Sequence, residues 1–546
     1  MTVALILFAL IIFTCILLNN LSSKIGLPVL LLFIIFGLLA GLGFDNTVEE
    51  YGKAVGDICT VALIFVMFYG GFGTRWTTAR PVVVEAGLLA SLGVILTAAG
   101  TGLFCHFVLG WKLVESFLMG SVICSTDAAT VFSILRTKHL GLKSGLAPVL
   151  EIESGSNDPC SYMLTAIFIS IMKGTATGGM VVWTVFAQLF FGALFGILIA
   201  QAGAYVLRRY HFKFSGFDTL FMFAIAILSY ALPSAVGGNG YLSTYIVGIV
   251  LGNVDFRGRK PMIPFFDGIT DLMQIVIFFL LGFMADPRDL LGVIPTALLI
   301  FLFLMLVARP AAVFSVLAPF RKYSAKMMGF VSFVGLRGAA SIVFAIMAVT
   351  GGFAMEHNIF NIVFVIVLLS IACQGSLIPM AARKFDVIDP HANNLKTFSE
   401  FTDHDELVFG KIKIKEGSTW LDKTIAEVGL PGDILIVGVE RAGKKYTPTK
   451  KFTIRKGDLL IISTRAYTAT SEGSVRSYPI EKGSKYIGQD IRAFAKDKSV
   501  LVIMISRQKD FLIPDRDTEI RQGDVLMTMK REPAKLPEAA AVEPAK

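Results

Sequence analysis

Apolar runs succeed one another from Thr2 to about Lys384, each long enough to cross a lipid bilayer. A transmembrane helix needs about 20 predominantly apolar residues, which matches the length of these runs. The composition agrees, because 54% of the 546 residues are hydrophobic and only 17% are charged. We therefore predict an all-α polytopic membrane domain of about thirteen helices, at residues 2–20, 27–44, 55–73, 82–109, 115–135, 142–173, 180–208, 217–233, 240–252, 265–284, 290–318, 325–351 and 358–382.

Lysine and arginine residues are distributed unevenly between the loops that join these spans. One side carries most of them, whereas the other carries only Lys53, Lys112, Lys173 and Arg288. Positively charged loops stay in the cytoplasm, so the pattern places the N-terminus outside and the C-terminus inside a bacterial cell membrane. The net charge of +9 is spread over these loops and forms no patch that would bind nucleic acid. Residues 3–18 lack a basic segment and a cleavage site, so they form a span rather than a secretory signal.

Three acids, Glu151, Glu153 and Asp158, lie within the span predicted at residues 142–173. A carboxylate is costly at that depth, so an acid inside a span is by default a candidate functional residue. The alternative is that these polar groups only hold helices together, but such contacts seldom need three acids within two helical turns.

Asp158 is accompanied by other oxygen ligands. Helical spacing puts Ser154 and Asp158 on roughly one face, with Asn157 between them. Pro159 has no N–H group, which leaves the carbonyl of Gly155 without its helical partner. These are hard oxygen ligands, the type that alkali cations prefer, so we predict a K⁺ or Na⁺ site at Asp158. Only Asp158 of the Asn157-Asp158 pair can titrate, so we expect electroneutral exchange of one proton for one cation.

Two spans are interrupted in corresponding places. The fifth span carries Ser125-Thr126-Asp127, and the twelfth carries residues 335–338 with the sequence Gly-Leu-Arg-Gly. Each is the fifth of six spans on its side of the seventh, and such paired interruptions predict an inverted-repeat transporter with its site at the midplane. Thr126 and Asp127 can supply oxygens there and offset the partial charges of the broken helix ends. Asp127 would also fit the simpler alternative of a buried structural cap.

Arg337 lies within the second interruption. A cation that is buried in a membrane needs an acidic partner. Glu153 is the candidate, because it stands beside the face that carries Asp158. We predict that Glu153 and Arg337 form a structural ion pair rather than take part directly in transport.

These segments resemble the signature motifs of a known family. Residues 125–132 (STDAATVF), 151–159 (EIESGSNDP) and 335–341 (GLRGAAS) are similar to those of the cation:proton antiporters of the NhaP/NHE branch. The resemblance covers the whole membrane domain, in order. It implies a thirteen-helix homodimer in which an inverted-repeat core domain moves against a dimer domain.

The resemblance also implies functions for individual residues. Asp158 would bind the cation and the proton in turn, helped by Ser154, Asn157 and the break at Thr126-Asp127. The family also implies the pair of Glu153 with Arg337.

One position departs from the family pattern. Many relatives carry an acid before the Gly-Gly of the third span, where this chain has Tyr69 before Gly70-Gly71. A tyrosine offers a hydroxyl but no charge, so Tyr69 is a candidate determinant of ion selectivity.

Beyond residue 385 the chain is more charged, and it repeats itself at an offset of 66 residues. A constant offset predicts two copies of one small α/β module, each with a Gly-Ser turn, an apolar strand and a Gly-Asp turn before another strand. The matching positions are Gly417-Ser418 and Gly483-Ser484, Arg441 and Arg507, Pro448 and Pro514, Ile454-Arg455 and Ile520-Arg521, Gly457-Asp458 and Gly523-Asp524, and Leu460 and Leu526.

The order of these features resembles the C-terminal module of regulators of potassium conductance (TrkA-C, or RCK_C). In that family such modules dimerise and often bind a small regulatory ligand, which implies a cytoplasmic regulatory tail with a small nucleotide as its regulator. No GxGxxG sequence follows a strand, so a nucleotide-binding Rossmann partner is not expected. The predicted parts are a membrane domain at 1–385, a linker at 386–405, modules at 406–470 and 471–531, and a disordered tail at 532–546.

Three classes of function fit these observations. A secondary antiporter is favoured, because it explains the buried acids and the paired breaks. A ligand-gated cation channel is the runner-up, since regulator modules also occur on potassium channels, but the Thr-Val-Gly-Tyr-Gly filter is missing. A receptor or structural protein leaves the acids unexplained. Nothing suggests an enzyme, and the six cysteines suggest neither disulfides nor a metal site.

The ligand types do not determine which cation binds, since oxygen ligands suit both sodium and potassium. The regulatory modules and the tyrosine at position 69 favour K⁺/H⁺ exchange in pH homeostasis. Na⁺/H⁺ exchange is the alternative.

Overall fold

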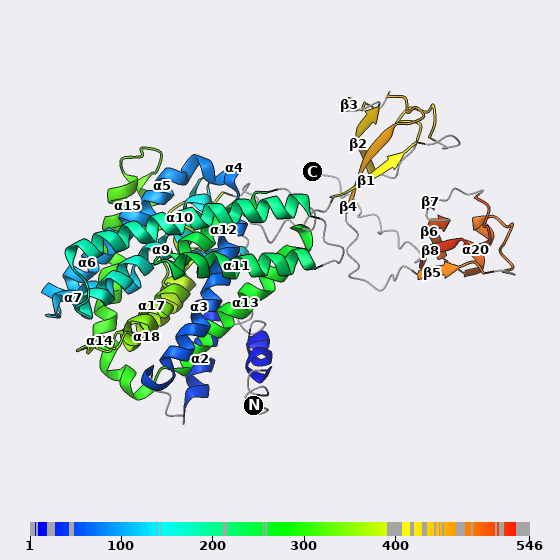
Figure 1. The fold of residues 1–546 in the computed structure, drawn as a ribbon. Helices are drawn as coiled ribbons and strands as arrows, with labels where there is room; N and C mark the ends of the chain where they lie inside the picture. The colour runs from blue at the N-terminus through cyan, green and yellow to red at the C-terminus, as the bar shows by residue number, and fades with distance from the viewer. Residues whose placement is uncertain are drawn as a thin grey trace, which may run out of the picture. The chain divides into compact units, whose positions relative to one another are not determined.

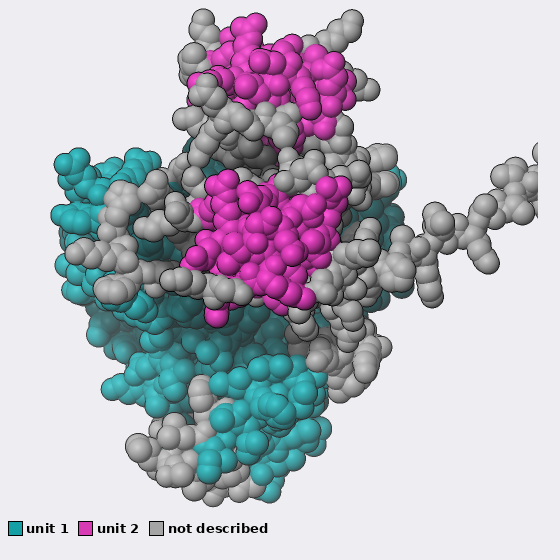
Figure 2. Space-filling view, turned by 90° about the vertical axis from the view of Figure 1, so that its right-hand side faces the viewer, with its two compact units in different colours: residues 1–404 teal, residues 405–546 magenta. Residues whose placement is uncertain are grey.

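The computed structural model divides the chain into two compact units, Met1–His404 and Asp405–Lys546 (Figure 2). The first unit is helical, and the second contains all the described strands (Figure 1). The predicted linker beyond residue 389 and the predicted disordered tail lie outside the described residues. The structure describes residues 6, 9–18, 28–42, 48–138, 140–143, 145–210, 216–254, 256, 259–389, 407–414, 420–428, 434–441, 444–446, 448–449, 452–465, 476–481, 484–498, 500–507, 510–512 and 518–530.

The helices of the first unit follow the predicted spans in order. After a short helix at Ala9–Leu18, the first half contains α2 (Val29–Gly41), α3 (Val48–Gly73), α4 (Trp76–Ala79), η1 (Arg80–Val82), α5 (Val83–Leu88), η2 (Leu89–Gly93), α6 (Val94–Phe107), α7 (Leu113–Ile123), α8 (Ala128–Thr137) and α9 (Leu146–Met172). The remainder contains α10 (Gly178–Arg209), α11 (Phe217–Ala235), α12 (Gly240–Gly252), α13 (Arg259–Phe283), α14 (Pro287–Phe303), η3 (Leu304–Ala308), α15 (Arg309–Leu317), α16 (Ala325–Phe333), α17 (Ala339–Val349), α18 (Ile359–Leu369), η4 (Ser370–Gly375) and α19 (Ser376–Lys384).

Seven helical stretches among the described residues are long and apolar enough to cross a membrane. They are Tyr51–Gly73, Trp76–Phe107, Gly178–Arg209, Phe217–Ala235, Met262–Phe283, Pro287–Leu317 and Ile359–Lys384. Shorter apolar helices accompany them, and α9 has sufficient length at 27 residues but carries the three acids. The prediction of a helical membrane domain is therefore confirmed.

Both predicted interruptions are present. The span predicted at 115–135 consists of α7 and α8, separated by residues 124–127, and the span predicted at 325–351 consists of α16 and α17, separated by residues 334–338. A π-helical turn lies in the span before each break, η2 in the first half and η3 in the second. The two halves therefore share local irregularities at equivalent places, as an inverted repeat requires.

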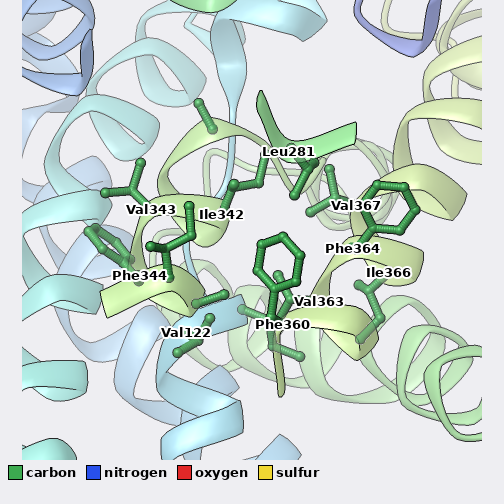
Figure 3. Packing of buried hydrophobic residues seen from close by; sticks show 14 of the residues in the cluster. Val122, Leu281, Ile342, Val343, Phe344, Phe360, Val363, Phe364, Ile366 and Val367 are labelled. Carbon is green, nitrogen blue, oxygen red and sulfur yellow. The ribbon is translucent and has the colours of Figure 1, made fainter. Parts of the chain in front are cut away.

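Half-helix α17 is enclosed by other helices. Every residue from Ala339 to Ile346 is buried, so this helix is apolar on all sides rather than on one face. Figure 3 shows its side chains Ile342, Val343 and Phe344 together with those of α18, among them Phe360 and Phe364. The close packing fixes the position of the break at the start of α17.

Glycines allow α3 and α12 to touch along their backbones. A side chain at Gly71 would meet the carbonyl of Tyr245, and one at Gly248 would meet the carbonyl of Phe68. This contact holds α3, which carries Tyr69, against the rest of the bundle.

The second unit contains two four-stranded antiparallel sheets. Their strand orders are β1-β4-β2-β3 and β5-β8-β6-β7, so the second sheet repeats the topology of the first. The pairing register shifts between Ile436 and Gly438 in one sheet and between Val502 and Met504 in the other, again 66 residues further along. The elements are β1 (Leu407–Lys413), β2 (Ile434–Arg441), β3 (Lys444–Tyr446), β4 (Leu459–Arg465), β5 (Arg476–Pro479), α20 (Ile491–Lys498), β6 (Val500–Arg507), β7 (Asp510–Leu512) and β8 (Val525–Lys530).

The same ion pair organises each sheet. Arg441 donates two hydrogen bonds of 2.7 Å to Asp458, and Arg507 does the same to Asp524. Burial alone would raise the pKa of each aspartate, but the guanidinium and a backbone N–H outweigh it and hold the pKa below its ordinary value. The matched arginines and aspartates of the sequence repeat therefore have a structural explanation.

Candidate functional site

The two helix breaks cross each other. The backbone N–H of Asp127, at the end of the first break, donates a 2.9 Å hydrogen bond to the carbonyl of Leu336 in the second. Backbone groups that leave a helix inside a membrane lose their helical partners and need others. The crossing satisfies part of that need, and it brings four half-helix ends to one place.

The positive charge of Arg337 balances the partial negative charge at the end of α7. Its guanidinium donates to the carbonyls of Cys124 and Ser125, at 2.9 Å and 2.6 Å, where the helix dipole leaves partial negative charge. Its backbone N–H donates to the hydroxyl of Ser370, 3.0 Å away. Arg337 therefore joins the first break to the second and to the last span.

The acidic partner predicted for Arg337 is wrong. Glu153 pairs instead with Arg309, at 2.9 Å and 3.0 Å to its two carboxylate oxygens, and both side chains are about 2% exposed. Arg337 already has the carbonyl groups at the end of α7 as partners. Arg309, at the start of α15, directs its long side chain from the neighbouring span to the acid, which residue spacing does not reveal.

Arg309 was missed by the sequence analysis, although a signal for it exists. It stands with Pro310 in the middle of the apolar run predicted at 290–318. A cation in such a run needs a partner as much as Arg337 does.

Helix α9 presents its polar residues to the first break. Ser154 donates a 2.7 Å hydrogen bond to the carbonyl of Thr126, and the Asn157 amide donates to the Thr126 hydroxyl at 2.5 Å. Thr126 donates in turn to Glu153 at 3.3 Å. The predicted group of Ser154, Asn157 and Thr126 is thus brought together, and Glu153 links it to Arg309.

Asp158 is buried and accepts a hydrogen bond from the hydroxyl of Ser125. Ser125 belongs to the predicted interruption but was not among the predicted site residues. Its position directly before Thr126 was the available signal. Because the break turns successive residues in different directions, Ser125 reaches Asp158 while the Thr126 carbonyl faces Ser154.

Asp127 lies where two half-helices begin. Its carboxylate accepts from the backbone N–H of Thr130 at 3.2 Å and from the Thr130 hydroxyl at 2.6 Å, which caps α8. It also contacts Gly338, directly before α17, so closely that a side chain there would collide with it. The negative charge of Asp127 therefore faces the positive ends of both helix dipoles.

A cavity of about 170 Å³ reaches Asp158. Ser154, Thr126, Asp127 and Tyr69 also line it, whereas Asn157 is fully buried behind its wall. Oxygen atoms therefore dominate its polar lining, which suits a hard monovalent cation. The other lining residues are Leu63, Val66, Met67, Gly70, Gly73, Ser125, Ala129, Phe132, Glu151, Gly155, Gln274, Phe278, Gly338, Ala339 and Ala340.

Aromatic rings occupy the opposite side of Asp158. Tyr162 lies one turn further along α9, and its ring centre is 5.1 Å from that of Tyr241 and 6.0 Å from that of Phe344. The cavity, in contrast, extends towards Glu151 at the beginning of α9. An ion in the cavity therefore reaches Asp158 from the side of the bundle where α9 begins.

The chain matches known proteins in both units. The transmembrane domain of the sodium/hydrogen exchanger family matches residues 9–384, and the TrkA-C domain matches residues 411–466 and 475–527. The chain is 33% identical to the K(+)/H(+) antiporter NhaP of Alkalimonas amylolytica, over 78% of this chain and 74% of the relative. It is 30% identical to the K(+)/H(+) antiporter NhaP2 of Shewanella baltica, over 82% of this chain and 78% of the relative.

A solved structure has the same fold. The sodium proton antiporter MjNhaP1 of Methanocaldococcus jannaschii superposes with a TM-score of 0.62 at 21% sequence identity. The match covers 70% of this chain and 99% of that one. The prediction of an antiporter-like helical fold with TrkA-C modules is confirmed.

The ion pair of Glu153 with Arg309 yields a stability prediction. Arg309→Met leaves a buried carboxylate without its partner, so we expect a loss of roughly 3–5 kcal/mol of stability. The double variant Glu153→Gln/Arg309→Met buries no unpaired charge, so its melting temperature in detergent should recover most of the loss. Arg321→Ala, in an exposed loop, is the control and should melt like the wild type. A double variant as unstable as Arg309→Met would contradict the pairing.

Proposed function

The chain belongs to the sodium/hydrogen exchanger family, and we propose that it exchanges potassium, in preference to sodium, for protons across a bacterial cell membrane. The observation that carries this proposal is Asp158, a carboxylate buried beside two crossing helix breaks and open to a cavity whose polar groups are mostly oxygen atoms. Asp158 binds the cation and the proton alternately, because one carboxylate cannot hold both charges at once. The two relatives named above are both K(+)/H(+) antiporters, which supports potassium.

The surrounding residues have different functions in this proposal. Ser154, Thr126 and Asp127 lie on the cavity and offer oxygens to a dehydrated cation. Asn157 is fully buried and donates to Thr126, so it positions the break rather than binding the ion. Tyr69 supplies a neutral hydroxyl to the cavity, and a weaker field of this kind favours the larger and more easily dehydrated K⁺.

The charges around the breaks support electroneutral exchange. Two cations, Arg309 and Arg337, face three acids, Glu153, Asp127 and Asp158, in the contacts of the breaks. Glu151, further along the cavity wall, interacts electrostatically with Arg75 and is counted with it. One negative charge is in excess, and either one proton or one monovalent cation on Asp158 neutralises it. Buried charge is costly in a low-dielectric interior, so both loaded states are favoured over the empty one.

The cavity supports an inward-facing state. It extends towards the start of α9, which the distribution of basic loops places on the cytoplasmic side. The rings of Tyr162, Tyr241 and Phe344 lie between Asp158 and the predicted outer side. We infer that α9 and the two breaks move together against α3 and α13 to open the other side, within a homodimer whose N-termini are outside.

A contact at the end of the membrane unit supports regulation by the tail. Leu142 and Ile388 form a β-bridge, Lys143 donates its N–H to the carbonyl of Val387 at 2.8 Å, and the Lys143 ammonium lies 3.1 Å from Asp386. The loop at residues 141–143 joins α8, which directly follows Asp127, to α9, which carries Asp158. The first residues of the predicted linker therefore contact the connection between these two helices, and a small nucleotide on the tail can act through it.

Transport by proteoliposomes tests the proposed exchange. Potassium added outside the vesicles should drive protons out of the vesicle interior. The half-saturating concentration of potassium should be lower than that of sodium. Asp158→Asn should abolish this flux, because an amide does not titrate, while the melting temperature stays close to that of the wild type. Asp289→Asn, at an exposed position in the first turn of α14, is the control. A residual flux in Asp158→Asn would show that another group, first of all Asp127, carries the proton.

The charge count predicts that transport is insensitive to voltage. A membrane potential imposed with a permeant organic ion should leave the initial rate of exchange unchanged, because each cycle moves one positive charge in each direction. The measurement is the proton flux at several imposed potentials and a constant pH difference. A rate that changed severalfold with potential would mean unequal numbers of protons and cations.

Truncation tests regulation. A chain that ends after Asp389 keeps the contact with the loop at residues 141–143 but lacks the modules, so we expect active exchange with an altered dependence on pH or nucleotide. A chain that ends after Phe385 also loses the contact and is the matched comparison. Exchange rates across pH, at equal amounts of protein in the membrane, give the result. Profiles identical to that of the full chain would contradict a regulatory tail.

A further inference from the structure

A second group of ionisable side chains lies far from Asp158, at the predicted outer ends of the helices. Glu115 belongs to the first turn of α7, and Glu356 and His357 belong to the loop between α17 and α18. One ligand atom from each of the three lies within 4.8 Å of the other two. Neither the transport chemistry nor the regulatory tail uses these residues.

Glu115 is held in place, but among the described residues no lysine or arginine forms an ion pair with it. Only 1% of the residue is exposed, and its carboxylate accepts the backbone N–H of His357 at 2.9 Å. The imidazole Nδ1 lies 3.3 Å from the same oxygen. A buried carboxylate prefers a cationic partner, and a neutral N–H group does not supply one.

His357 is fixed by an aromatic ring. The indole of Trp111 stacks on the imidazole with ring centres 4.0 Å apart, and the indole itself is 4% exposed. The backbone carbonyl of Trp111 is held at 2.8 Å by His106. The imidazole therefore has a fixed orientation beside Glu115, as a metal-binding histidine does.

Glu356 is the exposed member of the group. Its side chain is 54% exposed and forms a 2.7 Å ion pair with Lys112, whose side chain is 72% exposed. Both side chains of this ion pair face solvent, so the Glu356 carboxylate can exchange Lys112 for another cation at little cost.

We propose that Glu115, Glu356 and His357 form a binding site for a divalent transition-metal ion of the zinc type. One imidazole and two carboxylates are ligands that Zn²⁺ accepts, and water completes the coordination. Ligand atoms around a tetrahedral Zn²⁺ lie about 3.3–3.5 Å apart, so the pair of Glu115 and His357 already fits and Glu356 moves inwards. Lys112 leaves Glu356 when the metal arrives.

The site lies beside the outer halves of both broken helices. Helices α7 and α17 are the outer halves of the two broken helices, and a metal ion would tie the start of α7 to the loop after α17. The metal-binding proposal itself does not rest on the proposed antiport.

Zinc binding to the full chain, purified in detergent without a histidine tag, tests the proposal. Competition with a chromogenic zinc chelator gives the affinity and the number of ions bound. We expect His357→Gln and Glu356→Gln each to weaken one Zn²⁺ site by about tenfold or more. Glu356 is exposed, so its variant tests the site without a risk to folding. Lys112→Met should strengthen binding roughly two- to fivefold, because it removes the competing ammonium.

Asp289→Asn is the matched control, since this exposed carboxylate also lies at the start of a helix on the predicted outer side but is outside the proposed ligand set. Its zinc affinity should equal that of the wild type. Co²⁺ should also quench the fluorescence of Trp111, measured as the difference between the wild type and Trp111→Phe. Equal zinc affinity in the wild type, His357→Gln and Glu356→Gln would overturn the proposal, and so would an affinity that Lys112→Met lowers.

Discussion

Two interrupted helices cross inside an apolar bundle, and the charge at their ends must be balanced without water. The ends of α7 and α16 expose carbonyl groups, and the starts of α8 and α17 expose N–H groups. Arg337 binds the carbonyls that follow α7, and Gln374 donates to the carbonyl of Phe333 at the end of α16. Asp127 faces both starts. The site exists because these ends meet, and the other polar contacts nearby serve to hold them there.

The two halves of the bundle contribute unequally to this arrangement. Each half supplies a break and a last span that bonds to its own break, through Ser154 in α9 and Ser370 in η4. The acids that surround the crossing come from the first half, whereas Arg309 and Arg337 come from the second. Opposite charges therefore hold the halves together, and Asp158 is the acid that we propose exchanges a proton for a cation. The proposed transport site thus combines a matched pair of backbone breaks with an unequal distribution of charge between the halves.

Much of this was accessible from the sequence, for identifiable physical reasons. Apolar runs and basic loops predict the spans because the bilayer imposes their length and charge, and the breaks are recognisable as polar residues within such runs. The tail repeat was visible because the structure keeps Arg441 with Asp458 and Arg507 with Asp524 at one spacing. Ser125 and Arg309 were missed for opposite reasons. Ser125 is an ordinary polar residue in a break, and Arg309 lies outside the three signature segments at residues 125–132, 151–159 and 335–341.

The sequence by itself determined that charges would be buried here and that one carboxylate would stand among oxygen ligands. The tertiary structure alone decided which charges meet. Glu153 pairs with Arg309 because the span containing η3 passes close to α9, and Arg337 binds instead to the carbonyls that follow α7. The reason is that an arginine side chain is long and flexible, so its partner depends on which helices become neighbours. Helical periodicity fixes the directions of side chains along one helix and contains no information about the helix opposite.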